Sequence, residues 1–234
     1  MKVPWLTKKS ISVAAAGVLA DYETKIKRRV EPPIPVENII ERGLRLRLGF
    51  TDLRKSLKLD DVLGATYVKE KMICVDRSLS ENQNEGRLCF TFAHEAGHWV
   101  LHRTLVDQAC RTGGGNSFIF CRIKDAKKPI EWQADYFASC MLMPEAAVRN
   151  AFCRCYGKSP LILYNVKSAY CGPVCFDPCV ETWPKIAGMV KEAGGFSNVS
   201  RQAMIIRLQG FGFSTKRNSS QAVMEGVICD GLRF

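Results

Sequence analysis

The sequence predicts an α+β protein that is mostly helical and carries a small β-sheet of about three strands. Several long segments repeat apolar residues every three to four positions, as amphipathic helices do. Two shorter segments are rich in β-branched or alternating apolar residues, which is typical of strands. Of the 234 residues, 47% are hydrophobic and 24% are charged, the balance of an ordinary globular protein. No apolar run approaches the roughly 20 residues that span a bilayer, so no membrane association is expected.

The N-terminal segment predicts a helix that continues to Ile26, with Thr7 as its N-cap. The same stretch, MKVPWLTKK followed by ISVAAAGVLA, also has the outline of a signal peptide. The apolar spacing runs on through DYETKI, which favours a helix of the mature protein.

Strands are expected after a proline-rich linker and a short helix from Val36 to Arg42. LRLRLGF, residues 44–50, alternates apolar and polar positions, and ATYVKEKMICVD, residues 65–76, indicates a hairpin or a bent strand pair. Longer helices are predicted over residues 80–103 and 129–143, with Pro144 able to open a third. Two more helices follow, at residues 182–195 and 199–213, and one strand is possible in residues 219–234.

All three histidines of the chain lie in TFAHEAGHWVLH, residues 91–102, within one predicted helix. His94, Glu95 and His98 match the pattern H-E-x-x-H. Residues four apart share a helix face, so both imidazoles can bind one ion. Glu95 flanks that face and can take a proton from a metal-bound water. We therefore predict two metal ligands and a general base, although a short motif on a core helix can also arise by chance.

A catalytic zinc needs a third protein ligand and an open position. EWQAD provides Glu131 and, four residues later, Asp135, which would share a face of the next helix. Glu131 is the expected third ligand, and Asp135 is expected to accept the N–H of a ligand histidine. His102 lies one turn beyond His98, about 6 Å along the helix axis, which is too far to reach the same ion.

An additional proton donor often stabilises the oxyanion that forms during peptide hydrolysis. The sequence offers His102, Tyr67 and Tyr164 for this role without deciding among them. His102 has a structural alternative, since it can also pack at the end of its helix. The strand around residues 65–69 is a candidate sheet edge, to which an extended substrate could add as a further strand.

The chain has eleven cysteines, an odd number. Without a convincing signal peptide, a reducing cytoplasm is the expected location, and most thiols would be free and inert. A second metal site or a redox site is the alternative for a cysteine-rich segment, whose members are Cys153, Cys155, Cys171, Cys175 and Cys179. Their spacing differs from the common metal templates, which favour two intervening residues.

The formal net charge is +11, and part of it lies in KIKRR, residues 25–29. A solvated basic surface explains this charge more simply than a nucleic-acid site does. In the segment from Gly194 to Phe213, Arg201 and Arg207 could contact phosphate, as in a helix-turn-helix. Its apolar positions predict burial instead, which favours packing on the core or docking a protein; these are Ala203, Ile205, Ile206 and Leu208.

Five blocks in this order resemble the ImmA/IrrE family of metallopeptidases: PPIPVENIIERGLRL, GATYVKEKMICVDRSLS, RLCFTFAHEAGHWVLH, EWQADYFASCMLMP and VSRQAMIIRLQGFGF. The resemblance implies a zincin-like core and one Zn²⁺ per chain. It also implies that His94, His98 and Glu131 hold the zinc and that Glu95 is the general base. Better-known members of the family cleave helix-turn-helix repressors of mobile elements or stress genes, which suggests such a protein as substrate.

These inferences divide the chain into three parts. Residues 1–150 are the expected zinc metallopeptidase core, 151–182 a cysteine-rich insertion, and 183–234 a helix-turn-helix-like segment packed on the core. The leading hypothesis is a cytoplasmic zinc endopeptidase with a protein substrate. The alternative is a regulator that binds a repressor or DNA without cleaving it, with metal or redox sensing through the cysteines.

Overall fold

The chain forms two compact units in a computed structural model that describes residues 3–81, 84–112, 118–122, 128–157, 161–165 and 183–218. The first unit comprises the described residues of 1–145 together with Phe196–Ser200, and the second comprises those of 146–195 and 201–218. No helix among these residues has the length and apolar character that crossing a bilayer requires.

The first unit contains a four-stranded sheet in the order β1-β3-β2-β4. Its strands are β1 (Arg47–Thr51), β2 (Val62–Tyr67), β3 (Met72–Asp76) and β4 (Phe118–Arg122). The predicted hairpin is confirmed, since β2 and β3 pair antiparallel, and β1 adds parallel to β3. β4 was not predicted. Because β2 pairs with β4 on its other side, the hypothesis that residues 65–69 form a sheet edge is wrong.

The helices of the first unit are α1 (Lys8–Ile26), α2 (Val36–Asn38), η1 (Ile39–Gly43), α3 (Leu53–Leu57), α4 (Ser78–Glu81), α5 (Glu85–Arg111) and α6 (Pro129–Leu142). The predicted first helix is confirmed, and the side chain of Thr7 accepts a hydrogen bond from Ser10 N at 3.1 Å. The long helix begins later than predicted. Asn84 caps α5 by accepting from Arg87 N, and Ser78–Glu81 form the separate helix α4.

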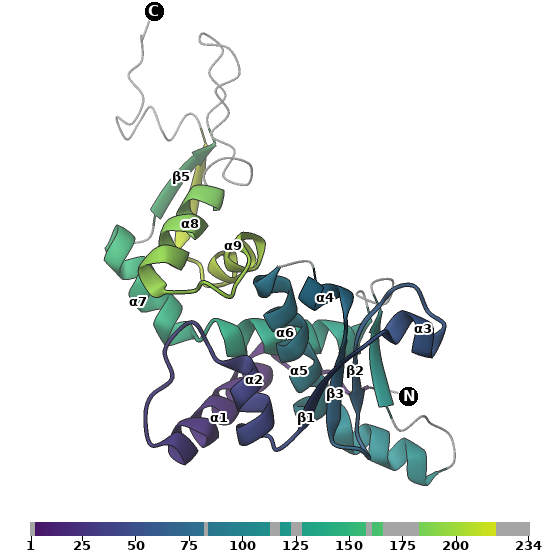
Figure 1. Cartoon of the computed structure of the whole chain (residues 1–234). Coiled ribbons are helices and arrows are strands. Elements are labelled where there is room, and N and C mark those ends of the chain that lie inside the picture. Colours follow the sequence, from purple (N-terminus) through teal and green to yellow (C-terminus); the bar gives the residue numbers. More distant parts are fainter. Residues whose placement is uncertain are drawn as a thin grey trace, which may run out of the picture. The chain divides into compact units, whose positions relative to one another are not determined.

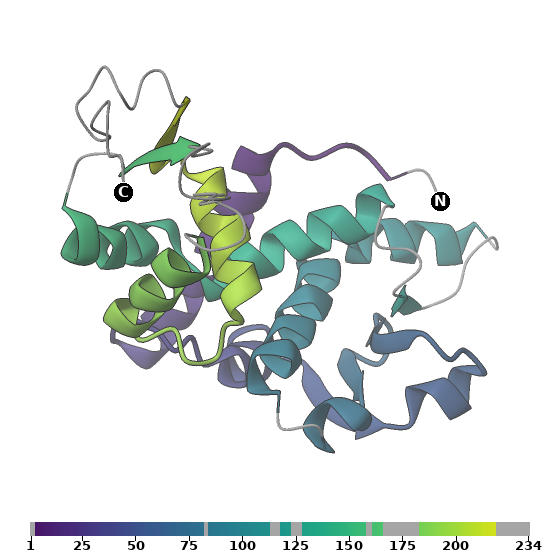
Figure 2. The same cartoon turned by 90° about the horizontal axis from the view of Figure 1, so that it is seen from above.

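The central helix α5 lies between α6 and the strands (Figures 1 and 2). Its middle turns, from Thr91 to His98, are buried all round, as expected of a helix with neighbours on every side. Helix α1 packs on α6 and on η1, and its buried residues are Ile11, Ala15, Val18, Leu19 and Tyr22.

Helices α5 and α6 make a close contact at Gly97. A β-carbon at this position would lie 3.2 Å from the Ala134 Cα and 3.1 Å from the Phe137 ring. Two small residues therefore let the two backbones come together, and the neighbour that would have to move is itself helix backbone. This contact determines how near α6 comes to the histidines of α5.

Asp76, at the end of β3, ties together three parts of the sheet side. Its carboxylate accepts hydrogen bonds from Leu53 N at 3.1 Å and from the Ser78 backbone at 3.2 Å, and Arg54 Nε lies 3.9 Å away. Burial opposes the charge and would raise the pKa of Asp76. The hydrogen bonds from Ser78 and the charge of Arg54 outweigh burial, so the pKa lies below its ordinary value.

A short segment from late in the chain completes the core of the first unit. Phe196 and Val199 are buried, and Asn198 Nδ2 donates a hydrogen bond to Ile34 O at 2.9 Å. Gly86 makes room for this segment, because a β-carbon there would lie 3.1 Å from Ser200 N.

The second unit contains α7 (Glu145–Tyr156), β5 (Leu161–Asn165), α8 (Trp183–Gly194), α9 (Arg201–Gly210) and β6 (Ser214–Asn218). Strands β5 and β6 pair in parallel. Both predicted C-terminal helices are present, but burial of Ile206 was wrongly expected, since its side chain is 59% exposed. Arg207 is buried with its guanidinium 4.5 Å from the Phe211 ring centroid. The strand expected in residues 219–234 lies outside the described residues.

Gly97→Ala should destabilise the protein. Alanine favours helix by about 1 kcal/mol, but forcing a methyl group between two packed backbones typically costs about 1–3 kcal/mol. Urea unfolding should give a lower free energy of unfolding. Gly17→Ala is the control, because this exposed glycine in α1 has open space around its β-position; it should gain about 0.5–1 kcal/mol. Equal gains for both variants would contradict a tight helix contact.

Asp76→Asn should remove part of the acid sensitivity of folding. The pKa of Asp76 in the folded chain is below its ordinary value of 3.8. Its contribution is therefore complete above that value and is lost as the pH falls through the folded-state pKa. The urea midpoint, followed between about pH 6 and pH 2, should fall less steeply for the variant than for the wild type. Parallel curves would show that Asp76 is not a source of this linkage.

Candidate metal centre

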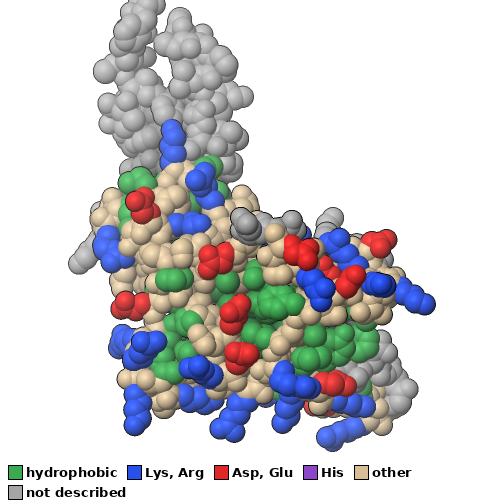
Figure 3. Space-filling model, in the orientation of Figure 1, with side chains coloured by type: hydrophobic (Ala, Val, Ile, Leu, Met, Phe, Trp, Pro, Cys, Tyr) green, Lys and Arg blue, Asp and Glu red, His purple; other side chains and the backbone are tan. Residues whose placement is uncertain are grey.

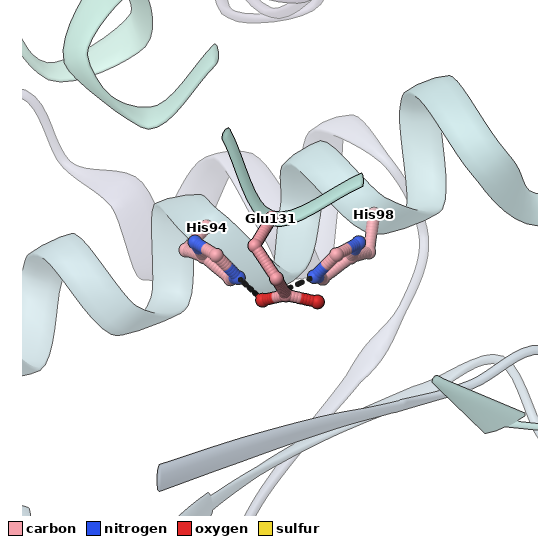
Figure 4. Close-up of side chains that lie close together, drawn as sticks. All are labelled: His94, His98 and Glu131. Carbon is pink, nitrogen blue, oxygen red and sulfur yellow. Dashed lines mark ion pairs between the residues drawn. The ribbon is translucent and has the colours of Figure 1, made fainter. Parts of the chain in front are cut away.

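Three buried side chains from two helices converge on one point (Figure 4). His94 and His98 project from successive turns of α5, and Glu131 comes from the first turn of α6. Glu131 Oε2 lies 3.2 Å from His94 Nε2 and 3.6 Å from His98 Nε2. Pro129 occupies the first turn of α6, where its ring suits a helix start. The helix therefore begins just early enough to present Glu131 to the histidines.

Each histidine has a partner for its other ring nitrogen. His94 Nδ1 lies 2.8 Å from Asp135 Oδ1, one helix turn beyond Glu131. His98 Nδ1 lies 3.1 Å from His102 Nδ1. Because a neutral imidazole carries one proton, a donor at Nδ1 leaves the Nε2 lone pair facing Glu131. Both rings can thus offer Nε2 to an ion.

The residues present fit a metal ion. The candidate ligand atoms of His94, His98 and Glu131 lie within 4.8 Å of one another, and no other such group is found among the described residues. Neither His98 Nε2 nor Glu131 Oε2 makes a hydrogen bond of acceptable geometry within the described part of the chain, although both are buried. Buried polar atoms ordinarily have partners. Two imidazoles and one carboxylate are a donor set that zinc accepts, with one position left for water.

The ionisation of the ligands suits a cation. Burial alone would raise the pKa of Glu131, but its close contacts with His94 and His98 hold the pKa well below its ordinary value. Burial lowers the pKa of His98 to about 4, even though its contact with Glu131 acts in the opposite direction. At neutral pH the site therefore presents a carboxylate and an uncharged imidazole, the forms that bind metal.

Glu95 lies beside this cluster and packs closely against Gly64 and Thr66 of β2. Its side chain is fully buried, and burial raises its pKa to about 7 despite His94 and a hydrogen bond from Thr66. Thr66 Oγ1 lies 2.6 Å from Glu95 Oε2 and 3.0 Å from the Glu95 carbonyl oxygen. A β-carbon at Gly64 would lie 2.4 Å from Glu95 Oε1, so only glycine leaves room for the carboxylate. Oε1 itself has no hydrogen-bond partner among the described residues.

Of the three proposed oxyanion donors, the described residues include the side chains of His102 and Tyr67, and neither lies at the cluster as a free donor. His102 is buried with both ring nitrogens engaged, by His98 and by Gln133 Oε1 at 3.0 Å. Tyr67 follows Thr66 on β2 and so points to the opposite face of the sheet, where it packs near Leu53 and Ala65. Tyr164 lies in β5, and its side chain is outside the described residues.

Of the five cysteines in the predicted second site, only two are described. Cys153 is exposed and Cys155 is half-buried, both on α7. Cys155 Sγ lies 3.6 Å from the Met189 carbonyl oxygen, and burial raises the pKa of its thiol. Cys171, Cys175 and Cys179 lie outside the described residues.

Sequence reasoning missed Gly64, Thr66 and Gln133. Gly64 and Thr66 approach Glu95 from a strand about 30 positions away, and no local pattern indicates that contact. Gln133 stands between Glu131 and Asp135 in EWQAD, so its position beside the metal ligands was visible.

Gly64→Ala should displace the Glu95 carboxylate without emptying the metal site. The added methyl group would overlap Oε1, and a misplacement of this kind can lower a hydrolytic rate on the order of 100-fold. Hydrolysis of a pool of internally quenched peptides should fall while zinc content is kept. The control is Gly49→Ala on β1, where the nearest atom to a β-carbon is the Cys74 sulfur at 3.3 Å. Equal activity in both variants would contradict the predicted fit around Glu95.

Comparison with known proteins places this site in a family. Residues 45–154 match the family model described as the IrrE N-terminal-like domain, Peptidase M78. No match is found among curated proteins. The matched segment contains the four sheet strands, both ligand-bearing helices and all the residues of the cluster. Residues 45–154 therefore match an IrrE N-terminal-like, Peptidase M78 domain, which agrees with the ImmA/IrrE family indicated by the sequence blocks.

Proposed function

We propose that this protein is a zinc-dependent endopeptidase in which His94, His98 and Glu131 hold one Zn²⁺ per chain and Glu95 is the general base. The observation that carries the proposal is the cluster itself. Three buried donor atoms meet within 4.8 Å, beside a fully buried carboxylate, in a domain of a metallopeptidase family. A protein that only binds DNA or a repressor has no need of the fourth group, Glu95.

Zinc in such a site polarises a carbonyl oxygen and makes a water more acidic. Glu95 then acts as a proton carrier: its free oxygen, Oε1, takes the proton of the attacking water and later delivers it to the leaving amine. A pKa near 7 suits a group that must both accept and return a proton. Thr66 donates to Oε2 and so keeps Oε1 as the working atom.

Asp135 has a supporting role in this proposal. By accepting the Nδ1 proton of His94 at 2.8 Å, it keeps the Nε2 lone pair available. The oxyanion donor stays open. His102 and Tyr67 are engaged elsewhere or turned away, and Tyr164 remains a prediction.

The substrate we propose is a helix-turn-helix repressor of a mobile element or stress regulon, on the strength of the family resemblance. Direct DNA binding by α9 is disfavoured, because Arg207 is buried against Phe211. On the visible face of the first unit, lysine and arginine side chains gather along the lower edge, and acidic side chains lie mainly across the middle (Figure 3). A reducing cytoplasm fits the cysteines, since Cys74, Cys89, Cys110, Cys140, Cys153 and Cys155 form no disulfide.

Glu95→Gln should abolish hydrolysis and leave zinc binding intact. Glutamine keeps the size of the side chain but cannot accept the proton, so loss of general-base catalysis should lower the rate by at least about 100-fold. Elemental analysis should give one zinc per chain for this variant and for the wild type. Mass spectrometry of a purified helix-turn-helix repressor should show cleavage products only with the wild type.

His98→Ala is the matched control, because it should lose both zinc and hydrolysis. A wild-type protein that binds no zinc after reconstitution would contradict the proposal. So would a Glu95→Gln variant that relieves repression as well as the wild type does, since that result identifies a non-cleaving regulator.

A further inference from the structure

A line of hydrogen bonds runs from a metal-ligand histidine to the N-terminal segment. His98 Nδ1 meets His102 Nδ1 at 3.1 Å, and His102 Nε2 meets Gln133 Oε1 at 3.0 Å. Gln133 Nε2 then donates to the Pro4 carbonyl oxygen at 3.0 Å. His98, His102 and Gln133 are all buried, so water does not compete for these contacts.

The Pro4 carbonyl, at the end of this chain of hydrogen bonds, determines which atom is the donor in each of the others. A carbonyl oxygen can only accept, so Gln133 must turn its NH₂ group toward Pro4 and its oxygen toward His102. That oxygen can only accept as well, so His102 carries its proton on Nε2. An uncharged His102 then has a lone pair on Nδ1, which requires His98 to donate from its own Nδ1. The Nε2 lone pair of His98 is left facing Glu131.

We propose that His102 and Gln133 are positioning residues through which the Pro4 carbonyl orients His98 for metal binding. This inference rests on the proposed metal site, and it adds a control of that site by the N-terminal segment. His94 differs, because its partner Asp135 is a carboxylate that can only accept. Gln133 is an amide that can present either end to His102, so it needs Pro4 to select one.

The N-terminal segment around Pro4 is held against α6 by a stack of aromatic side chains. Trp5 stacks on Trp132 with ring centroids 4.9 Å apart and planes 8° apart, and Trp132 stacks on Tyr136. Trp5 is 67% exposed, yet its stacking on Trp132 holds the backbone next to Pro4 against α6. Figure 2 shows this purple segment running beside α6. Any process that lifts Trp5 from α6 releases Pro4 and, with it, the preference for one orientation of Gln133.

The test measures zinc affinity by competition with a chromophoric chelator. Gln133→Leu removes the acceptor for His102 and should weaken zinc binding by about 10–100-fold. Trp5→Ala should weaken it by a smaller factor, several-fold, because Gln133 then samples both orientations. Gln133→Glu should bind zinc at least as tightly as the wild type, because a carboxylate accepts from His102 without selection by Pro4.

The decisive comparison is Trp5→Ala in the Gln133→Glu background, where it should change zinc affinity no further. An equal loss in both backgrounds would overturn the relay, because it would show a general packing effect. Trp5→Phe is the conservative control and should keep the wild-type affinity. Trp5 is exposed, so these variants should fold even if Gln133→Leu does not.

Nitrogen-15 NMR of the imidazoles gives an independent readout, since the chain has three histidines. In the zinc-loaded wild type, His102 should be the Nε2–H tautomer. An Nδ1–H tautomer would overturn the relay while leaving the metal site standing. A wild-type protein that binds no zinc would overturn both, so the two failures are distinguishable.

Discussion

The close approach of α5 and α6 at Gly97 and Ala134 is the constraint on which the site depends. Glu131 reaches both histidines because the backbones of α5 and α6 nearly touch at Ala134, one turn further along α6. The same contact brings Asp135 to His94 and Gln133 to His102. The contacts of Glu131, Gln133 and Asp135 with the histidines of α5 therefore depend on this close approach.

The site places ionisable groups where burial is unfavourable. Glu95, His98 and Glu131 are almost fully buried, and the carboxylates lack a full set of hydrogen bonds among the described residues. An uncompensated buried charge strongly destabilises a fold, whereas a bound cation would satisfy these groups together. Thr66 donates one hydrogen bond to Glu95 Oε2, which offsets part of the cost of burying this carboxylate. The other oxygen, Oε1, has no hydrogen-bond partner among the described residues. Burying Glu95, His98 and Glu131 together therefore costs folding stability and creates a group of side chains suited to binding a cation.

Local spacing explains what the sequence could predict. His94 and His98, like Glu131 and Asp135, are four residues apart on helices, so their shared faces follow from helix geometry alone. Gly64 and Thr66 contact Glu95 only in the folded structure, and β4 is a strand because it pairs with β2. Neither the Glu95 contacts nor β4 has a signature in the local sequence. Ile206 was misjudged because α9 has more apolar residues than its buried face accommodates. Gln133 shows a further limit: its role depends on Pro4, which lies 129 positions away.

The segment Phe196–Ser200 has a consequence for how the chain folds. Asn198 binds the carbonyl oxygen of Ile34 across a sequence separation of 164 residues, one of the largest loops that this fold must close. Because loop closure precedes the contacts that reward it, such pairs tend to form late. During synthesis, the ligand-bearing helices leave the ribosome well before the residues that finish their core. The first unit should therefore stay incomplete until residues 196–200 have been made.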